Sequence, residues 1–499
     1  DTPTFDARAA DGALCRSHYT VCAPCGPARA SLLTGMYLHN HRSVRNGTPL
    51  EDRHTNIARE MRRAGYRPML FGYTDTSLDP SAHAVEEVTR HGYESLMPGF
   101  DAGLLLPGED PRAWLDDLTR KGYAASSCEQ AFAVRGDPPR GCGRARVRAI
   151  YDSDDSQTAF LTRQVIDYLA GADPGWFVHL SWFRPHPPHI APAPWNDRYA
   201  AGSVPVPVRQ PSIAEEASTH PWLAAALGPN GDWYEDWMRD AIGTPNYDVE
   251  VRQLRATYYG LVSKVDHYFG QLMRFMRESG LVDDTLIVLT SDHGELLGDH
   301  YLFGKRGYFD AGFHIPLIVR DPYAPGRARG RTVESFSESV DVMPTLLDWL
   351  GLPVPRQCDG HSLLPAVRGE PAEAPDQVFW EYDFRNDDDG CGVEEELGLA
   401  PNQCLINVVR SRRYKYVHFA GLEPVFFDLE EDPGELINTA SLAPYREPML
   451  EHMQRLMTWR MTSDAPALTH LKVSRSGVFE SPKRRVKMKR RQRPGLDAG

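Results

Sequence analysis

The chain has 499 residues, of which 41% are apolar and 10% aromatic, so it can bury a large core in two or three domains, or in one large domain with a smaller one. Its formal net charge of −13 argues against nucleic acid as a partner. There is no apolar run of about 18 residues and no signal-peptide pattern, and the eight cysteines are scattered, so we expect no membrane segment and a cytoplasmic location.

Helices and strands alternate through the first 190 residues. The apolar run at residues 67–73 predicts a buried strand, and residues 175–183 predict another. Residues 125–150 are rich in Gly, Arg and Pro, which indicates a loop or an insertion. The expected helices cover residues 6–14, residues 56–64, and a segment that is capped by Ser153 or Asp154 and ends at Gly171.

The same alternation continues beyond a Pro- and Trp-rich stretch, residues 190–250, which we interpret as a long functional loop region. Apolar residues at helical spacing then predict a helix over residues 252–279, closed by Gly280. The elements expected after it are strands over residues 285–295 and 315–321 and a helix over residues 341–351.

The pattern changes at about residue 366, which predicts two domains. Residues 1–365 have apolar strands between helices, which predicts an α/β fold with a mainly parallel central sheet flanked by helices. Residues 366–475 hold strand-like runs such as "QVFWEYDF" and a helix at about residues 443–462, which predicts a smaller α+β domain with an antiparallel sheet. Residues 476–499 contain a basic run, which we interpret as a flexible solvated tail rather than a nucleic-acid arm.

Three polar clusters follow predicted strands, at residues 72–74, 184–189 and 291–295. Ligands of open α/β sheets bind at the carboxyl ends of the strands. Cys25 precedes a short apolar helix, and the N-terminus of a helix favours an anion. The convergence of these groups predicts a bound anion.

Several residues in or after these clusters have two interpretations. Asp292 and His293 could hold a divalent metal ion, or Asp292 could cap a helix while His293 is a buried core histidine. His186, held between prolines, suits a general acid, or it could bind zinc together with His189. Lys305 could reach over the anion as a point charge, or it could be an ordinary surface lysine.

Cys22 and Cys25 form a Cys-x-x-Cys pair, which could be a redox couple or half of a zinc site. A second frame, Cys-x-Pro-x-Arg, separates them. It fails from Cys22, because Gly26 stands at the arginine position, and it fits from Cys25, because Pro27 and Arg29 follow. This frame closely resembles the signature of the sulfatases, whose cysteine is oxidised to Cα-formylglycine.

The resemblance extends over most of the chain. "TPTFDARAADG", "TSDHGELLGDH", "DGHSLLP" and "FFDLEEDPGE" are similar to segments of the sulfatase family of the alkaline phosphatase superfamily. "FRPHPPH" and "DVMPTLLDWLG" are similar to its phosphonate monoester hydrolase and arylsulfatase subgroup in particular. The resemblance implies a formylglycine- and metal-dependent hydrolase that cleaves small-molecule sulfate esters or phosphonate monoesters, with phosphodiesters as a further class.

The resemblance also implies roles for single residues. A covalent intermediate would form on residue 25, which a formylglycine-generating enzyme would first convert, and His186 would protonate the leaving group. One divalent ion, Mn or Ca, would be bound by Cys25, Asp292 and His293. The residues implied around the substrate are Arg29, which would hold the formylglycine, and Lys305, Asn46 and Tyr73, which would contact substrate oxygens. A homo-oligomer is also implied.

Two features depart from the family pattern. The family's first strand, which carries further metal ligands, should precede "TPTFD", so we interpret the sequence as a fragment or a truncated gene product that lacks this central strand. "GYTDTS" lacks the usual lysine, and Asp75 stands where the subgroup has a threonine. A carboxylate there should repel an anionic substrate unless it binds a cationic group or stays protonated. These departures leave two alternatives to the hydrolase: an inactive binding or scaffold protein of sulfatase fold, and a redox or zinc protein.

Overall fold

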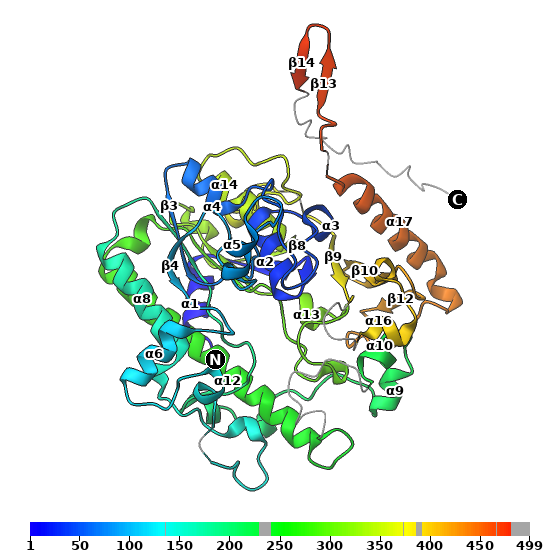
Figure 1. Ribbon diagram of the computed structural model, residues 1–499. Helices are drawn as coiled ribbons and strands as arrows, with labels where there is room; N and C mark the ends of the chain where they lie inside the picture. Colours follow the sequence, from blue (N-terminus) through cyan, green and yellow to red (C-terminus); the bar gives the residue numbers. More distant parts are fainter. Residues whose placement is uncertain (135, 229–240, 373, 386–391, 466, 481–499) are drawn as a thin grey trace.

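The computed structural model of the protein describes residues 1–134, 136–228, 241–372, 374–385, 392–465 and 467–480. The strands of the N-terminal part form two sheets (Figure 1). The first has the order β4-β3-β5, made by Asp101–Leu105, Arg67–Gly72 and Trp176–Leu180. The second has the order β6-β7-β1-β8, made by Ile287–Thr290, Leu317–Arg320, Ala13–Tyr19 and Arg331–Glu338.

Helices cover both faces of the first sheet. Successive residues of a strand point to opposite sides, so neighbouring apolar residues of β3 pack against helices on different faces. Leu70 of β3 packs in one core with residues of α2 and α4, and Phe71 packs in another with residues of α8 and α12. These four helices are Cys25–Thr34, Ile57–Arg63, Gln157–Gly171 and Tyr247–Glu278. The α/β class with flanking helices is confirmed.

Strand directions are mainly parallel, as expected. β3 runs parallel to both of its neighbours, and β1 runs parallel to β8. β7 departs from this pattern, since it runs antiparallel to both β1 and β6. The second sheet is therefore mixed.

Some elements differ from the sequence predictions. The first helix is α1, Pro3–Asp11, and β1 follows it at once, a strand that the polar run around Arg16 and Ser17 obscured. Residues 190–250 are less irregular than expected, because α12 already begins at Tyr247. Within this stretch α9 and α10 are also present, at Ile213–Ala217 and Pro221–Ala226, and residues 229–240 lie outside the described residues.

The C-terminal part contains the predicted antiparallel sheet, in the order β12-β11-β10-β9, and the helix α17, Arg446–Ser463. A short N-terminal strand, β2, Cys22–Ala23, joins the edge of this sheet, pairing in parallel with β9. The two parts of the chain therefore share one sheet. The strands β9 to β12 are Gln377–Asp383, Leu405–Ser411, Tyr414–Phe419 and Val425–Asp428.

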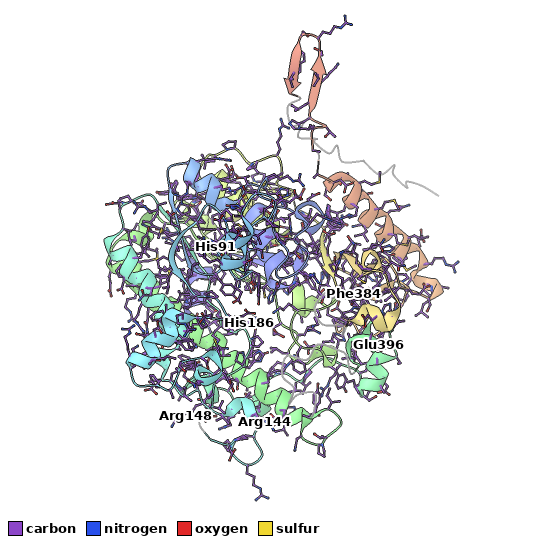
Figure 2. The ribbon with its side chains drawn as sticks, in the orientation of Figure 1. His91, Arg144, Arg148, His186, Phe384 and Glu396 are labelled. Carbon is purple, nitrogen blue, oxygen red and sulfur yellow. The ribbon has the colours of Figure 1, made fainter. Side chains whose placement is uncertain are left out.

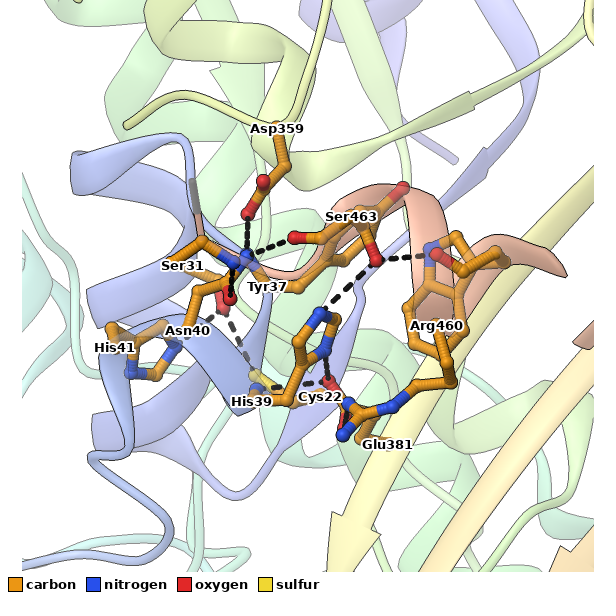
Figure 3. Close-up of polar contacts among 12 residues, drawn as sticks. Cys22, Ser31, Tyr37, His39, Asn40, His41, Asp359, Glu381, Arg460 and Ser463 are labelled. Atoms are coloured by element: carbon orange, nitrogen blue, oxygen red, sulfur yellow. Dashed lines mark hydrogen bonds and ion pairs between the residues drawn. The ribbon is translucent and has the colours of Figure 1, made fainter. Parts of the chain in front are cut away.

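A buried polar network strengthens this junction (Figure 3). His39 Nδ1, in α3 (Leu38–His41), lies 2.7 Å from Glu381 Oε2, and Arg460 Nη1 donates a hydrogen bond of 3.0 Å to Glu381 Oε1. His39 Nε2 lies 3.1 Å from Ser463 Oγ. The network therefore ties α3, β9 and α17 together.

The two N-terminal sheets do not join along β5 and β6. Among the described residues, β5 pairs only with β3 and β6 only with β7, and both strands are half-buried throughout. A cavity of about 1160 Å³ lies between them. Its apolar lining includes Val178, Leu180, Val265, Phe269 and Leu289. Within the described part, no helix is both long and apolar enough to cross a bilayer.

Candidate active site

Cys25 is the first residue of α2, and its Sγ lies 3.0 Å from Nε2 of His293. Burial raises the pKa of the thiol, but the charges of Lys305 and His293 and hydrogen bonds from His186 and His293 outweigh it, so the pKa lies well below its usual value. Charge-lowered thiols at helix N-termini are the reactive ones.

Cys22 lies in the opposite environment. Its Sγ is 3.2 Å from Ser31 Oγ, and burial raises the pKa of its thiol. Both cysteines are free thiols in the structure. A low-pKa Cys25 beside a high-pKa Cys22 supports the interpretation of Cys25 as a single special residue.

Arg29 connects the nucleophile's helix with the ends of two strands. It lies one turn beyond Cys25 on α2, and its Nε donates a hydrogen bond of 2.9 Å to Asp292 Oδ2. Its Nη1 donates to the carbonyl oxygen of Tyr73 at 3.0 Å, and the guanidinium lies 4.2 Å above the Tyr73 ring. Arg29 therefore fixes the position of Asp292 relative to α2.

Asp292 and His293 follow β6 directly. Together with Cys25 they form a group whose possible ligand atoms all lie within 4.8 Å of one another. Burial alone would raise the pKa of Asp292, but the charges of His293, Arg29 and Lys305 have the larger effect. The pKa therefore lies below its usual value, and the carboxylate is ionised. His293 Nδ1 lies 2.8 Å from the carbonyl oxygen of Gly294, which leaves Nε2 on the side of Cys25. These three residues fit a divalent ion, and no helix begins at Asp292 for it to cap.

Lys305 is only 5% exposed, so the alternative of a surface lysine is wrong. Two backbone contacts hold its loop: Leu296 N donates to the Gly304 carbonyl oxygen at 2.8 Å, and Gly304 N donates to Glu295 Oε1. The loop places a positive charge where it lowers the pKa of both Cys25 and Asp292.

His186 lies in the loop after β5, near the middle of the molecule (Figure 2). Arg184 Nη1 donates a hydrogen bond of 2.7 Å to the His186 carbonyl oxygen, and His186 Nδ1 lies 2.8 Å from the Pro187 carbonyl oxygen. His186 also lies close enough to Cys25 to lower the pKa of its thiol. Burial lowers the pKa of His189 to about 3, and neither His186 nor His189 belongs to a possible metal-ligand group within the described residues.

Asn46 lies beside the nucleophile. Its Oδ1 accepts a hydrogen bond of 2.8 Å from Gly26 N. A Cβ on Gly26 would lie 3.1 Å from the Asp75 carbonyl oxygen. Asn46 and Asp75 therefore both lie against the start of α2.

Asp75 is an unusual residue for an anion site. It is 6% exposed, its φ is +55°, and its buried Oδ1 accepts no hydrogen bond from any described residue. Burial raises the pKa of its carboxyl to about 7, because the favourable charge of Arg29 is opposed by Cys25, Glu94 and Asp292. The structure therefore keeps a carboxyl group close to Arg29 that ionises near neutral pH.

Three contributors were not predicted. Glu295 orders the Lys305 loop, Arg184 holds the His186 backbone, and the ring of Phe183 lies 4.5 Å from that of His186. Glu295 and Arg184 could have been found, because each lies in a polar cluster that the sequence analysis singled out. Phe183 looked like part of the preceding apolar strand.

Comparison with known proteins agrees with the resemblance to the sulfatases. The sulfatase family model matches residues 1–352, and a model described as "N-sulphoglucosamine sulphohydrolase, C-terminal" matches residues 298–463. The chain is 37% identical to the "Multifunctional alkaline phosphatase superfamily protein PehA" of Trinickia caryophylli, over 96% of this chain and 93% of that protein. It is 24% identical to an arylsulfatase of Clostridium perfringens, over 92% of this chain and 88% of that protein.

Two solved structures are similar over nearly their whole length. The phosphonate monoester hydrolase of Agrobacterium radiobacter has a TM-score of 0.90 and 39% identity, and the match covers 97% of this chain and 95% of that chain. The phosphonate monoester hydrolase of Silicibacter pomeroyi has a TM-score of 0.89 and 38% identity, over 96% and 94%. The chain belongs to the sulfatase family of the alkaline phosphatase superfamily.

Proposed function

We propose that the protein is a formylglycine-dependent hydrolase of sulfate esters and phosphonate monoesters, with phosphodiesters as a further class of substrate. The observation that carries the proposal is the position of Cys25, at the N-terminus of α2 and 3.0 Å from His293. Arg29 and Lys305 add positive charge around it, which suits an anionic substrate. The similarity to phosphonate monoester hydrolases and to an arylsulfatase supports both substrate classes.

Each residue has a role in the proposed reaction. After Cys25 is oxidised by a formylglycine-generating enzyme, the hydrated aldehyde presents two hydroxyl groups. One hydroxyl would lose its proton to solvent as its oxygen bonds to sulfur or phosphorus, while the ester bond breaks and His186 would give a proton to the departing alcohol or phenol. The second hydroxyl then loses its proton, the bond between residue 25 and the acid breaks, and the aldehyde reforms. Asn46, Tyr73 and Lys305 contact the substrate oxygens.

Residue 25 in its converted form, together with Asp292 and His293, would hold one divalent ion, Mn or Ca. When bound, the ion would neutralise the substrate anion and lower the pKa of the attacking hydroxyl. Arg29 positions Asp292 for this task through its hydrogen bond of 2.9 Å. The contact of His293 Nδ1 with the Gly294 carbonyl oxygen orients its ring in the way that ligating histidines are usually held.

The cavity between β5 and β6 also belongs to this proposal. Each strand has an edge without a strand partner among the described residues, and the space between them has an apolar lining. We infer that a further β-strand occupies this space. Its carboxyl end would lie near Arg29, Asp292 and His293, which line the same cavity, so it could supply the remaining ligands of the metal ion.

The proposal is tested by turnover of 4-nitrophenyl sulfate and 4-nitrophenyl phenylphosphonate, with protein produced beside a formylglycine-generating enzyme and loaded with Mn or Ca. We expect Cys25→Ala to abolish turnover and Cys22→Ser to retain it, because the Cys22 thiol only contacts Ser31. Loss of activity in both variants would favour a redox or zinc pair. Absence of turnover in converted, metal-loaded protein would favour the scaffold alternative, which the carboxyl group of Asp75 supports.

A further inference from the structure

His186 marks the side of the site toward which the leaving group departs, because in the proposed reaction this residue protonates the departing oxygen. The ring of Phe183 lies 4.5 Å from that of His186 and 6.3 Å from that of Tyr73. A leaving group on this side therefore extends along the Phe183 ring, which is half-buried. The groups that lie beyond this ring determine which leaving groups the site accepts.

Carboxylates lie beyond the Phe183 ring. A Cβ on Gly108 would lie 2.8 Å from Phe183 Cε2 and 2.9 Å from Glu94 Oε1, so the ring and this carboxylate meet at the same point of the backbone. Glu94 Oε2 accepts a hydrogen bond of 2.8 Å from Glu109 N, and Tyr93 OH donates one of 2.5 Å to Glu109 Oε1. Hydrogen bonds therefore fix both carboxylates on this side of the site.

Asp75 adds a buried carboxyl group near Glu94. Besides burial, the charge of Glu94 is one of the causes that raise the pKa of Asp75, so the two groups lie close to each other. The charge of Arg29 favours ionised Asp75, but the guanidinium donates hydrogen bonds to Asp292 and to the carbonyl oxygen of Tyr73. The buried Oδ1 of Asp75 accepts no hydrogen bond from any described residue, although buried polar atoms usually have a partner. A bound molecule with a donor would satisfy it.

Carboxyl groups beside an aromatic ring attract a cation. A metal ion does not fit between Asp75 and Glu94, because among the described residues the only group with ligand atoms close enough together is Cys25, Asp292 and His293. An organic ammonium does fit, since its three N–H donors can reach oxygens that lie farther apart than the ligands of one metal ion. The chemistry of this side of the site therefore indicates a protonated amine.

We propose that the substrates are esters whose leaving alcohol or phenol carries an aliphatic amine, and that the protonated amine binds between Glu94 and Asp75. This inference rests on the proposed function and specifies its leaving group. The anionic end of the ester lies at residue 25, near the positive charge of Lys305, and the cationic end lies beyond Phe183. Opposite charges at the two ends orient the ester in the site, and Asp75 then attracts one end of the substrate instead of only repelling the other.

The test compares 4-(aminomethyl)phenyl phenylphosphonate with 4-ethylphenyl phenylphosphonate, which has a methyl group in place of the ammonium. The readout is the ratio of their kcat/KM values, because a change of this ratio between variants cancels the difference in leaving-group acidity. Glu94→Gln and Asp75→Asn should each lower the ratio at least ~tenfold. Glu94→Gln keeps an oxygen that can accept from Glu109 N, so the fold is retained. Glu86→Gln, at an exposed position of α5 (Val85–His91), is the matched control and should leave the ratio unchanged.

A binding measurement separates this inference from the proposed function. Calorimetry with the leaving groups alone, 4-(aminomethyl)phenol and 4-ethylphenol, requires no turnover. We expect the amine to bind more tightly to the wild type, and Glu94→Gln to remove the difference. If neither ester is turned over while the amine still binds preferentially, the proposed function fails and the amine site stands. Equal binding of the two phenols to the wild type, or a kcat/KM ratio that Glu94→Gln leaves unchanged, would overturn the inference.

Discussion

Cys25 and Cys22 are separated by two residues, yet their thiols lie in opposite environments. The Cys-x-Pro-x-Arg frame selects Cys25 from the sequence, but its low pKa depends on His293 and Lys305, which lie 268 and 280 residues further along the chain. The loop that carries Lys305 is held by the hydrogen bond from Gly304 N to Glu295, which forms only in the folded chain. At the residue scale, the sequence predicts which cysteine is the special one, and tertiary contacts determine the pKa of its thiol.

His186 is expected to act as the general acid, so its removal should matter most when the leaving group is poor. We expect His186→Ala to lower kcat by about 10²–10⁴ for alkyl or weakly acidic phenyl esters, and much less for 4-nitrophenyl esters. The measurement is kcat over a series of aryl esters of rising leaving-group pKa. An equal loss across the series would contradict the role. His91→Ala, which changes an exposed histidine, is the control.

Asp75 gives a prediction for pH. Its pKa is raised from the ordinary value of 3.8 to about 7, so the carboxyl is neutral below about pH 7 and ionised above it. Stability that the neutral form contributes is lost as the pH rises from 3.8 toward about 7, and around and above about pH 7 the new charge repels an anionic ester. We expect kcat/KM of the wild type, relative to Asp75→Asn, to fall between about pH 6 and about pH 8. A ratio that stays constant would contradict this, and Asp75→Thr provides a second variant.

At the scale of elements, the network around Glu381 joins α3, β9 and α17 (Figure 3). Glu381→Gln removes the charge that faces both His39 and Arg460 and leaves buried donors poorly satisfied. We expect it to lower the free energy of unfolding by about 1–3 kcal/mol. Urea denaturation measures the change. Glu451→Gln, which removes an exposed pair with Arg455, should lower it by less than about 0.5 kcal/mol, and equal effects would contradict the role of the network.

Elements with strong periodicity were predicted well, and those that depend on distant partners were not. The helix at residues 56–64 and the strand at 67–73 correspond closely to α4 and β3. β1 was missed because Arg16 and Ser17 interrupt its apolar run, and its position is set by pairing with β7 and β8, about 300 residues away. β2 has only two residues, and its pairing with β9 has no local signal.

At the scale of the whole molecule, the cavity between β5 and β6 makes a prediction about hydrogen exchange. If a further strand occupies it, the outward amides of both strands are unprotected in the chain as it stands and become protected in any longer form that begins upstream of Asp1. Metal affinity should rise in parallel, because the strand would add ligands. Equal protection of β5 and β6 in both forms would contradict the inference.

The account depends most directly on the chemical state of residue 25, because every proposed step uses it. The measurement is mass spectrometry of the peptide that contains Cys25, from cells that carry a formylglycine-generating enzyme. We expect one sulfur and two hydrogens to be replaced by one oxygen at this residue. If Cys25 remains a thiol while a control sulfatase in the same cells is converted, the proposed nucleophile is absent and the catalytic account is contradicted.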